Sequence, residues 1–175
     1  MMTIDIRHKK LCIDIIYPKF SAEEMHMPSD KPYGLIYLPA DFYSFEIALQ
    51  RLWMKPKKLR LMLVMNPVGY IQHEVRELPE CRKINVDSCA IGDCGVPLGK
   101  RDDYAIETAA NLVIRKYKTF IWDPEIEILE KRPLFMPIYI YRGEKETWLY
   151  DTFTGKKISA ENPMLTPGLI KPIRK

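Results

Sequence analysis

The chain has 175 residues, of which 47% are hydrophobic and 29% charged, values that are typical of globular proteins and exclude a disordered chain. This length suits one domain of ordinary size or two small ones. The formal net charge of +4 permits binding to nucleic acid or another anionic surface but does not require it. Charged residues interrupt residues 1–20, and no stretch approaches the roughly 18 apolar residues that span a bilayer, so we expect a cytoplasmic protein without a membrane partner.

The first part of the chain predicts strands separated by a loop. Polar and apolar side chains alternate over residues 3–17, on both sides of His8-Lys9-Lys10, as in a hairpin with one buried face. Several prolines between residues 18 and 32 predict a loop, because proline lacks an amide donor. The apolar run Tyr33–Leu38 then predicts a short strand.

A helix is predicted next, over Phe42–Met54. Its apolar residues fall at i, i+3, i+4 and i+7, the spacing of one helix face, and they are Phe45, Ala48, Leu49 and Leu52. Pro56 is expected to end this helix. A second hairpin is predicted over Leu59–Leu78, with its turn at Asn66-Pro67-Val68-Gly69.

Residues 79–101 read as a connector between an N-terminal α+β subregion, residues 1–78, and a C-terminal subregion, residues 102–175. The connector concentrates glycine and three of the four cysteines. After it, Asp102 or Asp103 is expected to cap a helix that reaches about Tyr117.

The C-terminal subregion continues with strands and an extended tail. Pro137–Tyr141 is expected to pair with Thr147–Asp151, and the prolines beyond Asn162 predict an extended tail. The sequence therefore predicts an α+β fold, a mostly antiparallel, hairpin-rich sheet with two main helices.

The cysteines form the first candidate site. Disulfides are disfavoured in the cytosol, so the cysteines are candidates for a metal site or for a reactive thiol. Cys81, Cys89 and Cys94 with His73 are weak metal-ligand candidates, because no Cys-x2-Cys pair, the usual mark of a zinc site, is present. A thiol nucleophile at Cys89 or Cys94, with His73 as its base, is a further alternative. Unligated thiols are the simpler interpretation.

A basic cluster beside Trp53 forms the second candidate. Nucleic-acid-binding surfaces combine lysine and arginine with aromatic rings. The candidate residues for such a surface are Lys55, Lys57, Lys58 and Arg60. A solvated turn is the simpler interpretation of the same cluster.

An aromatic hairpin forms the third candidate. Alternation places Tyr139 and Tyr141 on one face of a strand, and Trp148 and Tyr150 on one face of the next. Aromatic pairs across two strands stabilise a hairpin by about 0.2–1 kcal/mol each. If their face is exposed, these four residues become a protein-binding surface, because aromatic residues are enriched at protein interfaces.

The C-terminal helix and hairpin resemble the PepSY domain. In that family an alanine-rich helix precedes strands, and the last strand ends in a Tyr/Val-Asp-x-x-Thr-Gly turn. The similar segments here cover about a third of the chain and are Ala105–Ala110, Pro137–Tyr141 and Trp148–Lys156. The resemblance implies non-catalytic binding and supplies no catalytic residues.

These patterns favour a non-enzymatic binding or assembly protein, a subunit of a larger complex that acts through sheet faces and its extended tail. Segment Leu165–Ile173 could add as a strand to the sheet edge of a partner. A nucleic-acid-binding accessory protein is the alternative, and a thiol- or metal-dependent enzyme centred on Cys81–Cys94 is the third hypothesis. We expect a protein partner or self-association, and no cofactor.

Overall fold

A computed structural model of the chain describes residues 10–21, 23–25, 33–51, 53–66, 72–92, 98–117, 123–142 and 147–159. The chain forms two compact units. Unit 1 comprises Met1–Pro39, Glu80–Asp93 and Leu134–Lys175, and unit 2 comprises Ala40–Pro79 and Cys94–Pro133. Each unit combines segments from distant parts of the sequence, whereas the predicted subregions are contiguous.

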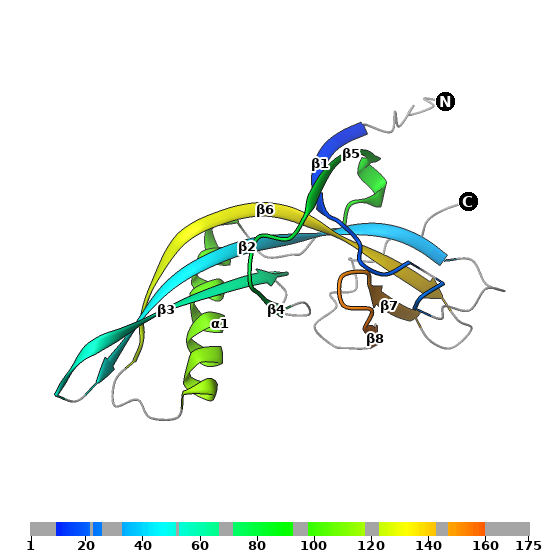
Figure 1. Cartoon of the computed structure of the whole chain (residues 1–175). Helices are drawn as coiled ribbons and strands as arrows, with labels where there is room; N and C mark the ends of the chain where they lie inside the picture. Colours follow the sequence, from blue (N-terminus) through cyan, green and yellow to red (C-terminus); the bar gives the residue numbers. More distant parts are fainter. Residues whose placement is uncertain are drawn as a thin grey trace, which may run out of the picture. The chain divides into compact units, whose positions relative to one another are not determined.

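Unit 2 contains a sheet covered by one helix. Strand β2 (Tyr33–Arg51) pairs antiparallel with β3 (Met54–Met65), which pairs antiparallel with β4 (Gln72–Val75). The strand order is β4-β3-β2-β6, where β6 is Glu125–Arg142. The short 3₁₀ helix η2 (Leu98–Lys100) leads into α1 (Arg101–Lys116), which lies beside the strands in Figure 1.

The predicted helix over Phe42–Met54 is wrong, because this segment is strand in β2 and the start of β3. The predicted fold class with two main helices is wrong with it. The structure is mostly strand, and α1 is the single α-helix in the ranges that it describes. Tyr43, Phe45 and Ile47 lie on one face of β2, and Phe42 and Ser44 are buried on the other face. Because both faces are buried, apolar residues do not alternate with polar ones, and some of them fall at a helical spacing by coincidence.

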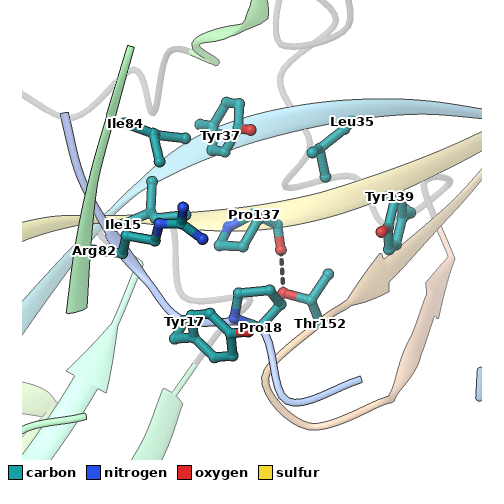
Figure 2. Close-up of a pocket in the computed structure, with 10 residues that line it drawn as sticks. All are labelled: Ile15, Tyr17, Pro18, Leu35, Tyr37, Arg82, Ile84, Pro137, Tyr139 and Thr152. Carbon is teal, nitrogen blue, oxygen red and sulfur yellow. Dashed lines mark hydrogen bonds between the residues drawn. The ribbon is translucent and has the colours of Figure 1, made fainter. Parts of the chain in front are cut away.

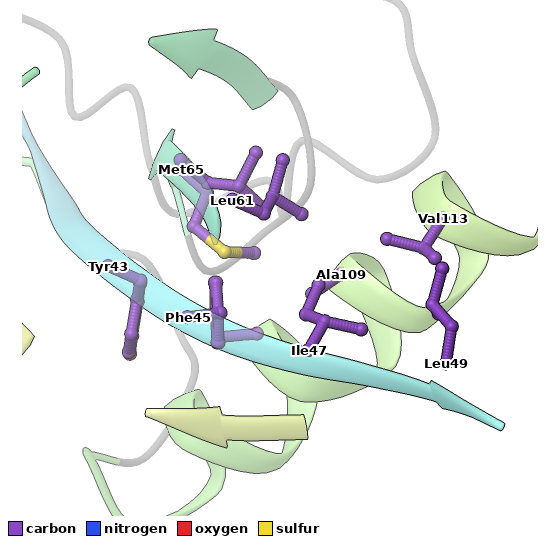
Figure 3. Close-up of a cluster of buried hydrophobic side chains, with 10 residues drawn as sticks. Tyr43, Phe45, Ile47, Leu49, Leu61, Met65, Ala109 and Val113 are labelled. Atoms are coloured by element: carbon purple, nitrogen blue, oxygen red, sulfur yellow. The ribbon is translucent and has the colours of Figure 1, made fainter. Parts of the chain in front are cut away.

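The core of unit 2 lies between β2, β3 and α1. Alternate residues of β2 point toward the helix, and the buried cluster consists of Tyr43, Phe45, Ile47, Leu49, Leu61, Leu63, Met65, Ala105, Ala109 and Val113 (Figure 3). The rings of Tyr43 and Phe45 stack at 5.6 Å between centroids. Alanine at 105 and 109 lets the helix approach the sheet closely.

The predicted helix near Asp102–Tyr117 is confirmed, but its predicted cap is wrong. The N-cap is Lys100, which makes no capping hydrogen bond through its side chain. Asp102 and Asp103 lie in the first turn, where their negative charge favours the helix dipole.

Unit 1 combines β1 (Lys10–Ile16), the start of β2, β5 (Cys81–Asp87) and the end of β6. Strand β1 pairs antiparallel with β5, and it pairs parallel with β6 through Ile15 and Phe135. The first strand of the predicted hairpin over residues 3–17 lies outside the described residues. The predicted connector contains a regular strand, β5, and the 3₁₀ helix η1 (Ser88–Ala90).

Unit 1 ends in the predicted aromatic hairpin. Strand β6 pairs antiparallel with β7 (Thr147–Asp151), from Ile138 opposite Asp151 to Arg142 opposite Thr147, which confirms the predicted pairing. Strand β8 (Lys157–Ser159) then pairs with β7. The predicted extended tail beyond Asn162, including Leu165–Ile173, lies outside the described residues.

Candidate binding face of unit 1

One face of the sheet in unit 1 is apolar across several strands. Residues directly opposite each other in an antiparallel pair point to the same face, and Ile13 lies opposite Ile84. The strand register and the contacts between the side chains place a set of apolar residues on this face. We call it the apolar face, and it comprises Leu11, Ile13, Ile15, Tyr37, Ile84, Val86, Ile91 and Phe135. No helix longer than the three residues of η1 belongs to unit 1 in the described ranges.

A groove of about 250 Å³ opens on this face. Its lining comes from β1, β2, β5, β6 and the segments that follow β1 and β7, and consists of Ile15, Tyr17, Pro18, Leu35, Tyr37, Arg82, Ile84, Pro137, Tyr139 and Thr152 (Figure 2). We call it the tyrosine groove, after Tyr17, Tyr37 and Tyr139. Apart from Arg82 and Thr152, its side chains are apolar or aromatic.

Hydrogen bonds to backbone carbonyl oxygens fix one wall of the tyrosine groove. The hydroxyl of Thr152 donates to the carbonyl oxygen of Pro137 at 2.7 Å (Figure 2). The carbonyl oxygen of Thr152 accepts hydrogen bonds from the amides of Lys19 and Phe20, at 2.9 and 3.0 Å. The amide of Tyr17 donates to the carbonyl oxygen of Glu80 at 2.8 Å. The chain after β1 is therefore held against the β6–β7 hairpin.

The turn after β7 holds Thr152 in place. One carboxylate oxygen of Asp151 accepts from the amide of Phe153 at 2.8 Å, and the other accepts from the hydroxyl of Thr154 at 2.6 Å. Gly155 closes the turn at φ 68°, a left-handed conformation that favours glycine. The Asp-to-Gly turn is a structural element that shapes the groove wall.

Arg82 is the cation of the tyrosine groove. Its side chain is exposed, and no carboxylate that the structure describes lies within ion-pair distance of its guanidinium group. Tyr37 also lines the groove. Burial raises the pKa of Tyr37, and the neighbouring Tyr139 raises this pKa further. Tyr37 therefore stays a neutral hydrogen-bonding group over the physiological range.

The four predicted aromatic residues lie together and continue the apolar face. Tyr139 is opposite Tyr150, and Tyr141 is opposite Trp148. Tyr141 and Tyr150 are buried, whereas Tyr139 and Trp148 are half-buried, and Met25 packs against the cluster. Burial also raises the pKa of Tyr150. Only Tyr139 of the four lines the groove, so the others support it, and their role in protein binding stays a prediction.

The sequence predictions did not include Tyr17, Leu35, Tyr37 or Arg82. Each of them lies on a strand, or just after one, that is distant in sequence from β6. The alternation of Leu11, Ile13, Ile15 and Tyr17 was visible as one strand face, but the sequence does not reveal which strands lie beside it.

The basic cluster lies in unit 2 at and near the start of β3, and its four side chains are exposed. The ammonium group of Lys58 pairs with Glu46 at 2.6 Å, and Arg60 donates a hydrogen bond to Ser44 at 3.2 Å. Lys57 lies 5.4 Å from the centre of the Tyr117 ring. Lys55 and Lys57 make no ion pair with a described residue. Nucleic-acid binding by this cluster stays a prediction.

The predicted metal ligands belong to different units of the structure. Cys81 begins β5 and Cys89 lies in η1, both in unit 1, whereas His73 lies on β4 in unit 2. Cys94 lies outside the described residues. Within the described ranges, no group of three or more histidine, cysteine, aspartate or glutamate side chains is placed to hold a metal ion.

A cluster of charged and polar side chains joins α1 to the strands of unit 2. Asp102 accepts a hydrogen bond from the hydroxyl of Tyr43 at 2.9 Å and pairs with Lys131 at 2.5 Å, and this lysine lowers the pKa of Asp102. Asp41 is 2% exposed and pairs with Arg101 at 3.5 Å. Burial raises the pKa of Asp41 despite that cation. These contacts fix the start of the helix, which is a structural role.

No family model, no curated protein and no solved structure matches this chain. The resemblance of the C-terminal third to PepSY domains therefore stays a prediction. In the described part of the chain, no helix has the length and apolar character needed to cross a membrane.

Proposed function

We propose that this protein is a non-enzymatic binding subunit that joins a cytoplasmic protein complex through the apolar face of unit 1. The observation that carries the proposal is the exposure of large apolar side chains around the tyrosine groove. Tyr17 is 45% exposed and Leu35 is 37% exposed, and both border an open hollow in an apolar sheet face. Exposed apolar surface of this kind marks sites of interaction.

The size and lining of the groove favour a segment of polypeptide over a small molecule. Small-molecule sites occupy about 300–1,000 Å³ and enclose most of their ligand. The tyrosine groove is smaller, at about 250 Å³, and open. Aromatic grooves hold extended proline-containing segments, because the polyproline II conformation presents preformed ridges to the rings. Tyr17, Tyr37 and Tyr139 supply such rings here.

Arg82 indicates the charge of the bound segment. Its guanidinium group borders an apolar groove without a carboxylate partner in the described part of the chain. An acidic side chain of the partner, or its C-terminal carboxylate, would neutralise the guanidinium group of Arg82 and accept two hydrogen bonds from it. The proposed partner segment is therefore extended, contains proline and other apolar residues, and carries a carboxylate at one end.

The test is fluorescence anisotropy with synthetic labelled peptides. One peptide contains prolines and leucines followed by glutamates, and a second replaces the glutamates with lysines. The Arg82→Glu variant should weaken binding of the acidic peptide several-fold and strengthen binding of the basic peptide. Lys83→Glu is the matched control, since Lys83 is an exposed cation of the same strand, points to the other face and does not line the groove.

A second variant tests the apolar contacts. Leu35→Asp places a charge on the groove without removing a buried side chain, and it should reduce binding of the acidic peptide by about tenfold or more, as loss of an apolar interface anchor does. Sedimentation velocity tests the other possibility, that the groove binds a second copy of this chain. The proposed function is refuted if neither peptide binds and the unaltered chain and Leu35→Asp are both monomers.

A further inference from the structure

The hairpin that joins β2 to β3 has an unusual tip. Arg51 pairs with Met54, so the strands are connected by a two-residue turn that contains Trp53. Two-residue hairpins favour asparagine and glycine, because these residues tolerate positive φ. Trp53 has φ 63°, a conformation that is unfavourable for a bulky side chain. A tryptophan at this position weakens the turn, and such strained residues cluster at functional sites.

The tip also exposes its apolar side chains. Trp53 is 95% exposed and Met54 is 63% exposed, which makes them the two most exposed large hydrophobic residues in the described part of the chain. Tryptophan is normally well buried, because it has the largest apolar surface of any side chain. Neither residue belongs to the buried clusters of unit 2.

Charge is distributed unevenly along this hairpin. Lys55 and Lys57 follow the tip directly and have no carboxylate partner among the described residues. Two acidic groups lie along the same hairpin: Glu125 accepts a hydrogen bond from Gln50 at 3.1 Å, near the level of Lys55 and Lys57, and Glu46 pairs with Lys58 further from the tip. The tip is therefore apolar at its end, has an excess of positive charge just behind it, and is mixed in charge further along.

We propose that Trp53 and Met54 insert into the headgroup region of an anionic lipid membrane, with Lys55 and Lys57 bound to the lipid headgroups. Tryptophan is the side chain enriched at membrane interfaces, and lysines near an anionic surface strengthen association. The absence of a membrane partner was expected from the lack of a spanning stretch, and surface association needs no such stretch.

A nucleic acid fits this tip less well. A single strand would stack a base on Trp53, but its phosphates would follow the hairpin and meet Glu46 and Glu125. Met54 would also gain no stacking partner. A membrane surface touches the end of the hairpin, where Trp53 and Met54 are exposed, so Glu46 stays in water beside its partner Lys58.

The experiment is co-sedimentation of the full chain with vesicles of phosphatidylcholine alone and of phosphatidylcholine mixed with phosphatidylserine. The protein should bind the mixed vesicles, and binding should weaken with added salt. Trp53→Ser should reduce the partition coefficient more than tenfold. The double variant Lys55→Ala/Lys57→Ala should reduce it by about 30-fold, since each lysine near such a surface contributes about 1 kcal/mol.

Matched controls separate the tip from general surface effects. Ile114→Ser removes an apolar side chain that is 43% exposed in the same unit, and Lys100→Ala removes an exposed cation. Both controls should bind the mixed vesicles as the unaltered chain does. The chain has three tryptophans, so the difference in fluorescence between it and Trp53→Phe isolates Trp53, which should shift to the blue when vesicles are added.

Two results would overturn the proposal. One is binding to mixed vesicles that Trp53→Ser leaves unchanged. The other is the absence of binding to mixed vesicles, and binding of labelled oligothymidine in that case would assign the tip to nucleic acid. The peptide assay tests other residues, which belong to unit 1. Neither of these two results therefore bears on the proposed function.

Discussion

Replacing Asp151 tests whether the turn after β7 holds the groove wall. Asp151 is 1% exposed, and its carboxylate accepts from the amides of Phe153 and Thr154, at 2.8 and 3.4 Å, and from the hydroxyl of Thr154. Asp151→Ala removes all three acceptor contacts. Asp151→Asn keeps one oxygen, which can still accept from the amide of Phe153.

The magnitude follows from the burial of the groups that lose their acceptor. A buried donor without a partner costs about 1–3 kcal/mol. The amide of Phe153 is in this position, whereas the amide and hydroxyl of Thr154 are half-buried and can turn to water. We therefore expect Asp151→Ala to lower the free energy of unfolding by about 1–3 kcal/mol, and Asp151→Asn to lower it by less than about 1 kcal/mol.

Urea denaturation followed by circular dichroism measures both values. Asp123→Ala is the matched control, because Asp123 is exposed and makes no hydrogen bond or ion pair with a described residue; it should stay within about 0.5 kcal/mol of the unaltered chain. Equal values for Asp151→Ala and Asp151→Asn would contradict the reasoning, because they would mean that the hydrogen bonds to the carboxylate do not hold the turn. Since Thr152 lines the groove, Asp151→Ala should also weaken binding of the acidic peptide.

Three further changes have defined outcomes. Gly155→Ala should cost about 1–2 kcal/mol in chemical denaturation, because its φ is 68° and an added Cβ would lie 3.3 Å from the Phe20 ring; a neutral result would mean that the turn can relax. Phe45→Ala, at a side chain with no exposed surface, should cost about 3–5 kcal/mol in the same assay, and a cost below about 1 kcal/mol would contradict the core described for unit 2. Asp102→Asn should lower stability at pH 7 and have no effect well below pH 4. The pKa of Asp102 is lowered in the folded state by Lys131, so its contribution is present above the unfolded value and is lost as the pH falls. This contribution should stay below about 1 kcal/mol, since the pair is exposed, and a pH-independent difference would contradict the assignment.

Local pattern predicted the elements whose neighbours are close in sequence. The helix over Arg101–Lys116 carries acidic residues in its first turn and basic residues in its last, and its apolar positions keep a single helical period. The pairing of β6 with β7 follows from alternating aromatic residues on two adjacent strands. In both cases the information lies within one short segment.

The tyrosine groove and the identity of β2 depend on distant contacts. Phe42–Met54 has apolar residues on both faces, because one face meets α1 and the other is also buried, so neither period is clean. The groove needs Tyr17, Leu35 and Arg82 placed beside Tyr139, and those neighbours are set by the pairing of β1 with β5 and β6 and by the place of β2 beside β6. Single-sequence patterns do not encode such pairings.

The division of the chain into units has a consequence for synthesis. Unit 2 is complete once Pro133 has been made, whereas unit 1 needs Leu134 and the residues after it. Strand β1 emerges early and its antiparallel partner β5 follows before unit 2 is complete, but the part of β6 that pairs with β1 is made only after unit 2, and pairings between such distant residues form slowly. During translation the apolar face of β1 and β5 therefore lacks β6 while unit 2 can already fold. Chaperone dependence in this protein should follow the exposure of this face, and it should end when β6 leaves the ribosome.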